Sequence, residues 1–593
     1  MPFEESNITF MYRRDIMPHN ENSRVKIPAL VHLTRLGYKY ISLKNYSETN
    51  LIDEDTNIFI DLFCDALNRI NNKAFSIAEV RSIVNELKTM LDNDDLGRAF
   101  YNTLLNGYKG IKLIDFDDKY NSYSVVTELT YKNGSDEFRP DVILLINGMP
   151  LSFVEVKKPN NKDGIQAEYS RINIRFQNKK FRRFVNLTQL MVFSNNREYD
   201  DNEVIPLEGA FYASSSYDKL FFSHFREEDT EIFNRIFSID EETENFVLLD
   251  NNLSSIKGTP EYNTNLNPCS PTNRIITSLF SRERILTILK YAFAYVEKTD
   301  DEGITHLEKH IMRYPQFFAT KAIEKHLDAE NKNGIIWHTQ GSGKTALTYF
   351  NVKYLTDYYQ KKGIIAKFYF IVDRLDLLNQ ATSEFRSRGL NVEEVSSKDD
   401  FIKNISSVTS TENTGKATIT VVNIQKFSTE SVAKNSDYAI DVQRVYFMDE
   451  AHRSYNPTGS FLGNLIESDR NAVKIALTGT PLIGVVYDEY GRPVGGKKYD
   501  SKQIFGDYIH KYYYNASIAD GYTLKLIREG IATTYRERLQ SALAEIKTLQ
   551  GSIQKKEMYA HPKYVSELVN YIANDFETSR IAMNDDSVGG MIV

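Results

Sequence analysis

Three ionisable residues interrupt an apolar segment, RPDVILLINGMPLSFVEVKKP from Arg139 to Pro159: Asp141, Glu155 and Lys157. Carboxylates are hard oxygen ligands suited to Mg²⁺, and a bound Mg²⁺ can polarise a phosphodiester and lower the pKa of a bound water. A neighbouring lysine can position the nucleophile or stabilise developing charge. These residue types suit a metal-dependent cutting site, with Asp141 and Glu155 as candidate metal ligands.

Two short strands would position these side chains. Asn147 and Gly148 are turn residues between two apolar runs, so the segment predicts a β-hairpin. Alternate residues of a strand share a face, which places Glu155 beside Lys157, and the hairpin returns Asp141 towards them. A charged strand edge that protects against aggregation is the structural alternative for so short a pattern.

A glycine-rich segment, HTQGSGKT, predicts a phosphate-binding loop. It follows the apolar run GIIWH and precedes the helix-forming sequence TALTYFNVKYLTDYYQKK. Gly341 and Gly343, with Ser342 between them, let backbone N–H groups point at phosphate oxygens, as does the start of the next helix. His338 stands where the strict GxxxxGK[ST] pattern has a glycine, so a flexible surface turn is the alternative.

Side chains from this loop and from a second strand would complete an ATP site. Lys344 would contact the β- and γ-phosphates, and the Thr345 hydroxyl can bind Mg²⁺. In YFMDEAH, Asp449 would help hold that ion and Glu450 would orient the attacking water, while His452 completes the DEAH pattern. Because both motifs end apolar strands, coincidence is disfavoured.

The elements that carry the motifs change along the chain. Up to about residue 250, amphipathic helical segments mix with short strands, as in an α/β or α+β unit. From Gly334, apolar runs alternate with helical segments, which predicts a parallel sheet with ligands at the carboxyl ends of its strands. The loop-like stretch from Asn251 to Arg274 predicts a domain boundary.

The composition is typical of a large protein with packed hydrophobic cores. The 593 residues suffice for several domains, and 41% hydrophobic residues can build packed cores. Cys64 and Cys269 are too few for a disulfide framework, and no Cys/His cluster has zinc-site spacing. The sequence shows no signal-peptide pattern and no membrane-length apolar run, so we expect a soluble cytoplasmic protein without membrane contact.

The net charge of −8 means that any nucleic-acid binding must be local. One candidate is RINIRFQNKKFRRF, from Arg171 to Phe184, which contains six basic residues, no acidic residue and interleaved aromatic residues. A solvated helix face explains such a run equally well, because charge patterning is a weak signal.

The motifs TQGSGKT, DEAH and LTGTP, the last from Leu477 to Pro481, resemble motifs I, II and III of superfamily 2 helicases and translocases. The resemblance extends from about Arg313 to Ile509. It implies that Gln316 reads the adenine and that Thr478 and Thr480 couple nucleotide state to DNA contacts. The segments FIVDRLDLLNQ and VVNIQKF resemble motifs that touch the DNA backbone.

The spacing PD, thirteen residues, then ExK resembles the active site of PD-(D/E)xK nucleases. Nucleases of this branch carry QxxxY on the following helix, whereas this chain has QAEY, with Gln166 and Tyr169 one residue closer together. The resemblance implies a catalytic role for Gln166. Tyr169 is equally well explained as a packing residue.

A nuclease-like unit ahead of a helicase-like motor resembles the R (HsdR) subunit of type I restriction endonucleases, whereas type III subunits carry the nuclease after the motor. The resemblance implies ATP-driven translocation of duplex DNA, with ATP and Mg²⁺ as cofactors. It also implies methyltransferase and specificity subunits as partners, with S-adenosylmethionine on the former. The alternatives are a type III restriction subunit, a repair or remodelling helicase with an N-terminal DNA-binding module, and a protein-interaction scaffold.

The expected fold class is α/β in three parts. Residues 1–255 would form the endonuclease domain, 256–500 the first RecA-like domain with the ATP site, and 501–593 the beginning of a second RecA-like domain. Motifs V and VI, with the arginine that would complete the ATP site, have no match. We therefore expect a truncated chain that binds ATP weakly and translocates little.

Overall fold

The two apolar runs around Asn147 form antiparallel strands in the computed structural model, β5 (Val142–Ile146) and β6 (Met149–Val156). Asn147 and Gly148 have φ angles of 54° and 78°, the left-handed backbone that a two-residue hairpin turn requires. A Cβ added at Gly148 would lie 2.7 Å from the Phe59 carbonyl oxygen, so the turn also needs a residue without a side chain. The predicted hairpin is confirmed.

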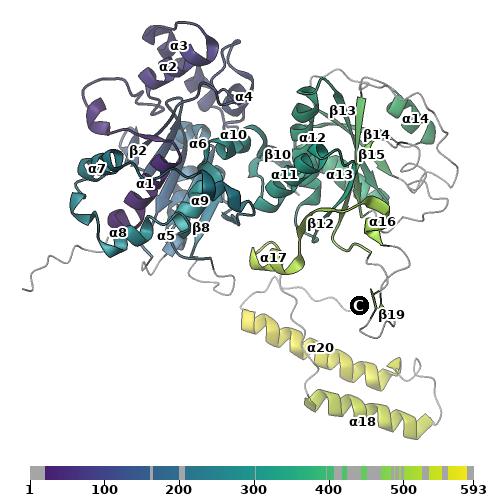
Figure 1. Cartoon of the computed structure of the whole chain (residues 1–593). Coiled ribbons are helices and arrows are strands. Elements are labelled where there is room, and N and C mark those ends of the chain that lie inside the picture. Colours follow the sequence, from purple (N-terminus) through teal and green to yellow (C-terminus); the bar gives the residue numbers. More distant parts are fainter. Residues whose placement is uncertain are drawn as a thin grey trace, which may run out of the picture. The chain divides into compact units, whose positions relative to one another are not determined.

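This hairpin is central in a seven-stranded sheet with the order β1-β2-β5-β6-β7-β8-β9. Strands β2 and β8 of this sheet are labelled in Figure 1. The pairs β1/β2 and β6/β7 are parallel, and the other neighbours are antiparallel. The remaining strands are β1 (Lys39–Tyr40), β2 (Tyr123–Thr127), β7 (Leu190–Ser194), β8 (Ala210–Ala213) and β9 (Ser223–His224), and a separate hairpin is formed by β3 (Tyr131–Asn133) and β4 (Asp136–Phe138). The helices of this part are α1 (Ile27–Arg35), α2 (Ile60–Asn71), α3 (Ile77–Leu91), α4 (Arg98–Asn106), α5 (Gly164–Gln177), α6 (Arg182–Leu187), α7 (Glu241–Asp250), α8 (Pro260–Asn265), α9 (Pro271–Phe280) and α10 (Arg282–Tyr291).

A second seven-stranded sheet, with the order β14-β15-β13-β16-β17-β12-β20, is parallel throughout. An antiparallel hairpin precedes it in the chain. Its strands are β12 (Asn333–His338), β13 (Ile365–Val372), β14 (Asn391–Val395), β15 (Thr418–Asn423), β16 (Val442–Asp449), β17 (Val473–Thr478) and β20 (Tyr508–Tyr512), and the hairpin is β10 (Phe293–Thr299) and β11 (Thr305–Ile311). The predicted α/β class is confirmed, with a parallel sheet in the part of the chain whose sequence resembles a helicase-like motor, called the motor part below.

Helices connect the parallel strands, as crossover connections require. They are α12 (Lys344–Gln360), α13 (Leu375–Ser387), α14 (Lys398–Ser406) and α16 (Ser501–Phe505). In addition, α11 (Tyr314–Asp328) precedes β12 and α17 (Tyr514–Ala519) follows β20, and a small strand pair is β18 (Val486–Tyr487) with β19 (Pro493–Gly495). The domain limits proposed at residues 255 and 500 stay predictions, although β20 extends the second sheet as far as Tyr512.

The structure describes residues 21–159, 164–199, 208–300, 302–395, 397–406, 417–423, 442–450, 469, 471–482, 486–487, 493–495, 500–523, 533–550 and 559–583. The chain divides into one unit of residues 1–523 and a second of residues 524–593. In the second unit, α18 (Thr533–Gln550) packs against α20 (Pro562–Met583), where the rings of Tyr535 and Tyr571 lie 4.6 Å apart.

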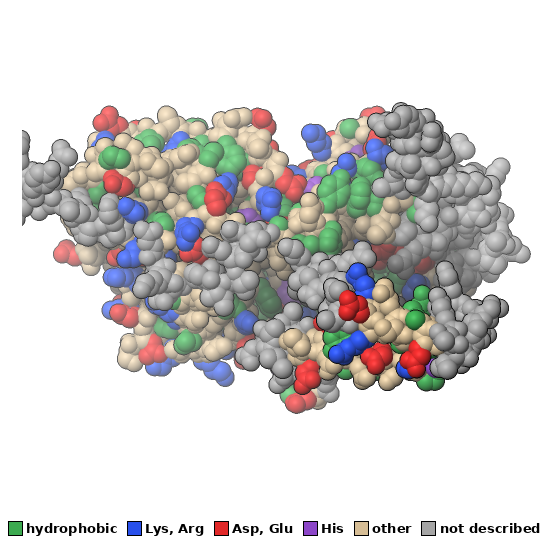
Figure 2. Space-filling model, turned by 90° about the horizontal axis from the view of Figure 1, so that it is seen from below, with side chains coloured by type: hydrophobic (Ala, Val, Ile, Leu, Met, Phe, Trp, Pro, Cys, Tyr) green, Lys and Arg blue, Asp and Glu red, His purple; other side chains and the backbone are tan. Residues whose placement is uncertain are grey.

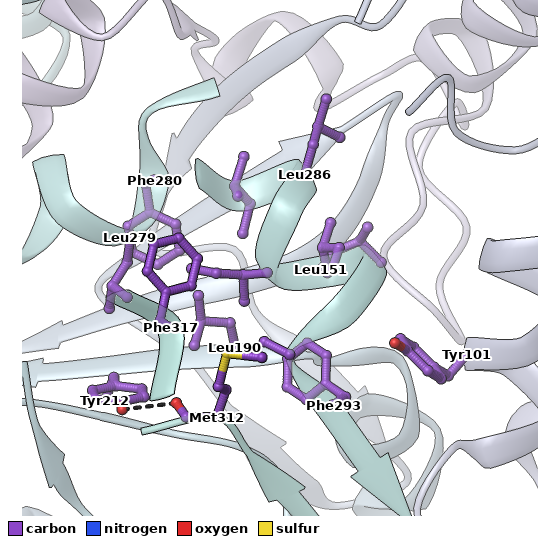
Figure 3. Close-up of a cluster of buried hydrophobic side chains, with 14 of the residues drawn as sticks. Tyr101, Leu151, Leu190, Tyr212, Leu279, Phe280, Leu286, Phe293, Met312 and Phe317 are labelled. Atoms are coloured by element: carbon purple, nitrogen blue, oxygen red, sulfur yellow. Dashed lines mark hydrogen bonds between the residues drawn. The ribbon is translucent and has the colours of Figure 1, made fainter. Parts of the chain in front are cut away.

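One buried apolar cluster runs from the first sheet through α9 and α10 to the motor part. The Tyr212 hydroxyl of β8 donates to the Met312 carbonyl oxygen at 2.9 Å, just before α11 begins. Figure 3 shows side chains of this shared core: Leu151, Leu190, Tyr212, Phe280, Leu286, Phe293, Met312 and Phe317. The two sheets are thus joined by packed side chains as well as by the chain itself.

Charges of both signs are interspersed over the described surface in Figure 2, in keeping with the small net charge. Among the helices that the structure describes, none is both long and apolar enough to cross a membrane.

Candidate active sites

The structure brings Asp141, Glu155 and Lys157 together, and these three residues are called the cutting site below. Glu155 lies near the end of β6, and Asp141 immediately precedes β5. The Asp141 Oδ2 atom accepts from the Val156 backbone N–H at 2.9 Å, and the Asp141 N–H donates to Glu155 Oε2 at 3.3 Å. The Lys157 Nζ atom donates to Glu155 Oε1 at 3.2 Å. The hairpin therefore places two carboxylates and one ammonium at one point.

Burial shapes the charges of this site. Glu155 is only 6% exposed, and burial, followed by repulsion from Asp141, raises its pKa to about 8 despite the attraction of Lys157. Burial also raises the pKa of Asp141. For Lys157 burial acts in the opposite sense, but the carboxylates of Glu155, Glu168 and Asp141 raise its pKa above the ordinary value. The site therefore holds a lysine cation among carboxylates, and the Glu155 carboxylate is the one that takes up a proton most readily.

The helix after the cutting site presents Glu168 to it. Glu168 lies on α5, its side chain is 1% exposed, and its Oε2 atom is 3.5 Å from Lys157 Nζ. Gln166, which the sequence resemblance assigned to catalysis, is exposed. Tyr169 packs against Phe222 with ring centroids 4.9 Å apart, and its hydroxyl donates to the Leu220 carbonyl oxygen. Glu168 was not among the residues predicted from the sequence, although helical periodicity from the buried apolar residues of α5 points to it.

The cutting site offers donors that fit Mg²⁺. Asp141 and Glu155 supply carboxylate oxygens, and Mg²⁺ is commonly held by one or two carboxylates together with substrate phosphates and water. Within the described ranges, no group of three or more His, Cys, Asp or Glu side chains has a metal-binding arrangement. The DNA phosphate and water would therefore have to complete the coordination of an ion here.

Replacing Glu155 by glutamine should change how stability depends on pH. The Glu155 carboxyl ionises near 4.5 in the unfolded chain and near 8 in the folded protein, so the folded state holds the proton more tightly. This contribution to stability is complete below pH 4.5 and is lost as the pH rises through about 8. Glutamine does not titrate.

In metal-free buffer with a chelator, the free energy of unfolding of Glu155→Gln relative to the parent should rise by at least about 1 kcal/mol between pH 5 and pH 8.5. Urea unfolding at the two pH values measures this, and a constant difference would contradict it.

The phosphate loop connects β12 to α12. Gly341 and Gly343 have φ angles of 81° and 82°, and Gly343 caps the helix that begins at Lys344. The Gln316 side chain donates to the Gly343 carbonyl oxygen at 3.0 Å and accepts from the Arg313 backbone N–H at 2.9 Å. The residue that the resemblance assigned to adenine thus lies against the phosphate loop.

Two groups near the predicted ATP site lie close to Lys344. Its Nζ atom lies 3.5 Å from the His338 carbonyl oxygen and 3.9 Å from Glu450 Oε1. Burial raises the pKa of Asp449, at the end of β16, to about 6, and its Oδ1 atom has no hydrogen-bond partner among the described residues. A buried carboxylate oxygen facing a lysine and a second carboxylate fits a magnesium ligand.

Other predicted motif residues are placed as follows. Ser342 is buried, and its hydroxyl donates to the Thr339 carbonyl oxygen at 2.6 Å. Thr478 ends β17, where its Oγ1 atom accepts from the Thr480 backbone N–H at 3.1 Å. His452 and the end of VVNIQKF lie outside the described residues.

A cavity of about 1880 Å³ opens at these strand ends. Its lining includes Gln316, Lys344, Thr345, Asp449 and Glu450, as well as side chains from the first sheet. Ligands of parallel α/β sheets bind at the carboxyl ends of strands, so its place agrees with a nucleotide site. Thr345 lines the same cavity as Asp449 and Glu450, the two acidic residues that were predicted to act with it.

Two side-chain networks join the N-terminal part to the end of the second sheet that carries the predicted phosphate loop. His338 is buried, which lowers its pKa well below the ordinary value, and its Nε2 atom lies 2.8 Å from His510 Nδ1. The His510 Nε2 atom lies 2.7 Å from a carboxylate oxygen of Glu228. His338, which stands where the phosphate-loop pattern has a glycine, therefore contacts His510 of β20, and His510 contacts Glu228 of the N-terminal part.

Asp520 should contribute strongly to the stability of this connection. Its buried carboxylate accepts from the hydroxyls of Tyr314 and Tyr512, the latter at 2.7 Å, and from Arg226 at 3.0 Å. Replacing it by alanine leaves three donors without an acceptor, so Asp520→Ala should lower the free energy of unfolding by about 3 kcal/mol. Urea unfolding measures the loss. Asp507→Ala, at an 85% exposed side chain, is the control and should change stability by less than about 0.5 kcal/mol. An equal loss of unfolding free energy in Asp520→Ala and Asp507→Ala would contradict the prediction.

The basic segment from Arg171 to Phe184 pairs extensively with carboxylates of the same domain. Arg171 and Arg175 lie 2.9 and 3.5 Å from Glu168. Further pairs are Lys180 with Asp136 at 3.1 Å, Arg182 with Asp94 at 2.8 Å, and Arg183 with Asp92 at 2.7 Å. Paired cations offer less net charge to phosphates, so nucleic-acid binding by this segment stays a prediction.

Two family models match separate parts of the chain. The model described as the N terminus of type I restriction enzyme R proteins matches residues 18–200, which hold the cutting site. The chain carries a type I R-protein N-terminal domain. The SWI2/SNF2 ATPase model matches residues 315–558, which begin next to Gln316 and hold the phosphate loop. The R-protein domain is thus followed by an ATPase domain, in the order that the sequence resemblance indicated.

Relatives share both parts. A type I restriction enzyme endonuclease subunit of Methanocaldococcus jannaschii is 25% identical over 528 residues, which cover 83% of this chain and 44% of the relative. A second such subunit, from Staphylococcus saprophyticus, is 24% identical over 565 residues, which cover 91% of this chain and 50% of the relative. A solved fragment of an HsdR subunit from Vibrio vulnificus is 12% identical, covers 78% of this chain and 72% of that chain, and has a TM-score of 0.26. This chain spans about half the length of the curated relatives it matches.

Proposed function

We propose that the chain is the nuclease and motor part of a type I restriction enzyme subunit. ATP hydrolysis would drive translocation along duplex DNA, and the cutting site would cleave it. The observation that carries the proposal is the convergence of Asp141, Glu155 and Lys157 on one hairpin of a type I R-protein domain, ahead of an ATPase domain.

At the cutting site, Asp141 and Glu155 would hold Mg²⁺. The bound ion would polarise the phosphodiester and acidify a water. Lys157, held at the buried end of the hairpin, would place its positive charge beside the phosphate as negative charge develops there. The buried setting of Glu155 strengthens these electrostatic effects, because little water competes.

At the ATP site, Lys344 and the backbone of the phosphate loop would bind the phosphates, with Thr345 and Asp449 available for Mg²⁺. Glu450 would orient the attacking water, and Gln316 would contact the base. Thr478 and Thr480, at the end of the neighbouring strand, would transmit the nucleotide state to bound DNA. Methyltransferase and specificity subunits would supply DNA recognition, with S-adenosylmethionine on the former, in the cytoplasm.

Plasmid cleavage tests the proposal against its alternatives. The intact subunit, assembled with its partner subunits, should cut covalently closed plasmid DNA only when both ATP and Mg²⁺ are present. Strand separation without cutting under all conditions would favour a repair or remodelling helicase. The absence of Mg²⁺ binding around Asp141 and Glu155 in calorimetric titration would favour a scaffold.

A further inference from the structure

Glu168 is a buried charge in a position that helical geometry assigns to the core. Ile165, Ile172 and Phe176 of α5 are each at most 1% exposed and pack in one apolar cluster. Glu168, three residues after the first of them and with a side chain 1% exposed, lies on the same side of the helix. An apolar residue would be the default there, because burying a carboxylate is costly unless cations compensate it.

Cations from two elements compensate this carboxylate. Arg171 and Arg175 lie on α5 itself, at 2.9 and 3.5 Å. The third is Lys157, at 3.5 Å, which comes from the end of β6. Although Arg175 is near, Glu168 Oε1 accepts no hydrogen bond among the described residues. Glu168 is therefore the charged contact through which α5 reaches the cutting site.

We propose that Glu168 is a positioning residue that holds the Lys157 ammonium at the scissile phosphate. This inference rests on the proposed nuclease function. A lysine has a flexible four-carbon stem, and its charge is useful only where the stem is fixed. The Lys157 Nζ atom is fixed by the Val156 carbonyl oxygen at 2.8 Å, by Glu155 at 3.2 Å and by Glu168 at 3.5 Å, and Glu21 lies further away, at 3.9 Å.

Glu168 differs from the other three groups around Lys157, of which Glu21 is the most distant and has a side chain that is 32% exposed. The Val156 carbonyl carries no charge. Glu155 is a proposed ligand of Mg²⁺, so the Glu155 oxygens would have to bind the ion as well as Lys157. Glu168 is the buried carboxylate from a separate element, and its two arginine partners keep it in place. Gln166 is exposed and Tyr169 packs against Phe222, so neither takes this role.

Cleavage by variants of the intact subunit, in its assembled complex, tests the role. With plasmid DNA, ATP and Mg²⁺, Glu168→Gln should lower the single-turnover cleavage rate about 10- to 100-fold, since misplacing a catalytic group by a small distance costs about this much. DNA affinity and ATP hydrolysis should not change. Glu168→Ala should lose more than Glu168→Gln, because glutamine keeps an oxygen that can face Lys157.

Glu244 provides a matched control. It is a buried glutamate on α7, lies 3.2 Å from Lys257 and accepts the Tyr262 hydroxyl at 2.8 Å. Glu244→Gln removes a buried, paired charge far along the chain from the cutting site, and cleavage should stay at the parent rate. If Glu168→Gln cut as fast as the parent, or if Glu244→Gln lost as much activity, the role of Glu168 would be overturned.

A double-mutant cycle on stability tests the contact without relying on cleavage. If Lys157 and Glu168 interact, the shift in urea midpoint caused by Glu168→Gln should shrink by about half or more when Lys157→Met is already present. Equal shifts in the two backgrounds would overturn the inference while leaving the proposed function intact. Undiminished cleavage by Glu155→Ala would instead overturn the proposed function, and the role of Glu168 with it.

Discussion

Glu155→Ala should abolish DNA cleavage in an assembled complex that contains the intact subunit, and it should leave ATP hydrolysis unchanged. The substitution removes the carboxylate that contacts both the Asp141 backbone and Lys157, and with it half of the proposed metal ligands. Loss of a metal ligand should lower the cleavage rate by at least about 1000-fold. Gel analysis of plasmid forms measures cutting, and phosphate release measures ATP hydrolysis.

The control for this variant is Glu137→Ala. Glu137 lies on β4 of the same domain, but its side chain is 66% exposed. It should cut like the parent. Cleavage by Glu155→Ala at more than about a tenth of the parent rate would show that the hairpin does not carry the cutting chemistry, since such a rate exceeds what a lost ligand allows.

Lys344→Ala should remove both ATP hydrolysis and cleavage. Lys344 is the first residue of α12, and its ammonium lies between the His338 carbonyl oxygen and Glu450, where phosphate charge would be neutralised. Losing this contact should lower the rate of ATP hydrolysis at least about 100-fold. Because cleavage is proposed to follow translocation, plasmid cutting should fail with it, although the cutting site is unaltered.

Lys361→Ala, at the exposed end of the same helix, is the matched control and should retain both activities. The two alanine variants together separate the sites: one loses cutting alone, and the other loses both activities. Full cleavage by Lys344→Ala would mean that cutting does not depend on the motor.

The hairpin and the phosphate loop could be predicted because their signals are local. Asn147 and Gly148 fix the turn, and the two-residue period of a strand then puts Glu155 and Lys157 on one face. Gly343 gives the left-handed residue that the start of α12 needs. These features need only a few neighbouring residues, so sequence patterns describe them well.

Other parts of the sites depend on pairings across long sequence distances. Arg226 and Asp520 are 294 residues apart, and no local pattern links them. Glu168 was missed for a different reason: the near-match QAEY drew attention to Gln166, whereas the helical period of α5 buries Glu168. The basic segment was likewise ambiguous, because its partners, such as Asp92 and Asp94, lie far upstream.

The apolar core that continues from the first sheet into the motor part links nucleotide binding to the integrity of the nuclease. Side chains such as Leu190 and Phe317 are buried in the same cluster, so opening one part exposes apolar surface of the other. A ligand that binds only the folded state stabilises it by about 2.7 kcal/mol at one hundred times its Kd. ATP bound at Lys344, as proposed, would therefore protect the hairpin of Asp141 and Glu155 against unfolding, and loss of the nucleotide would lower the stability of both parts.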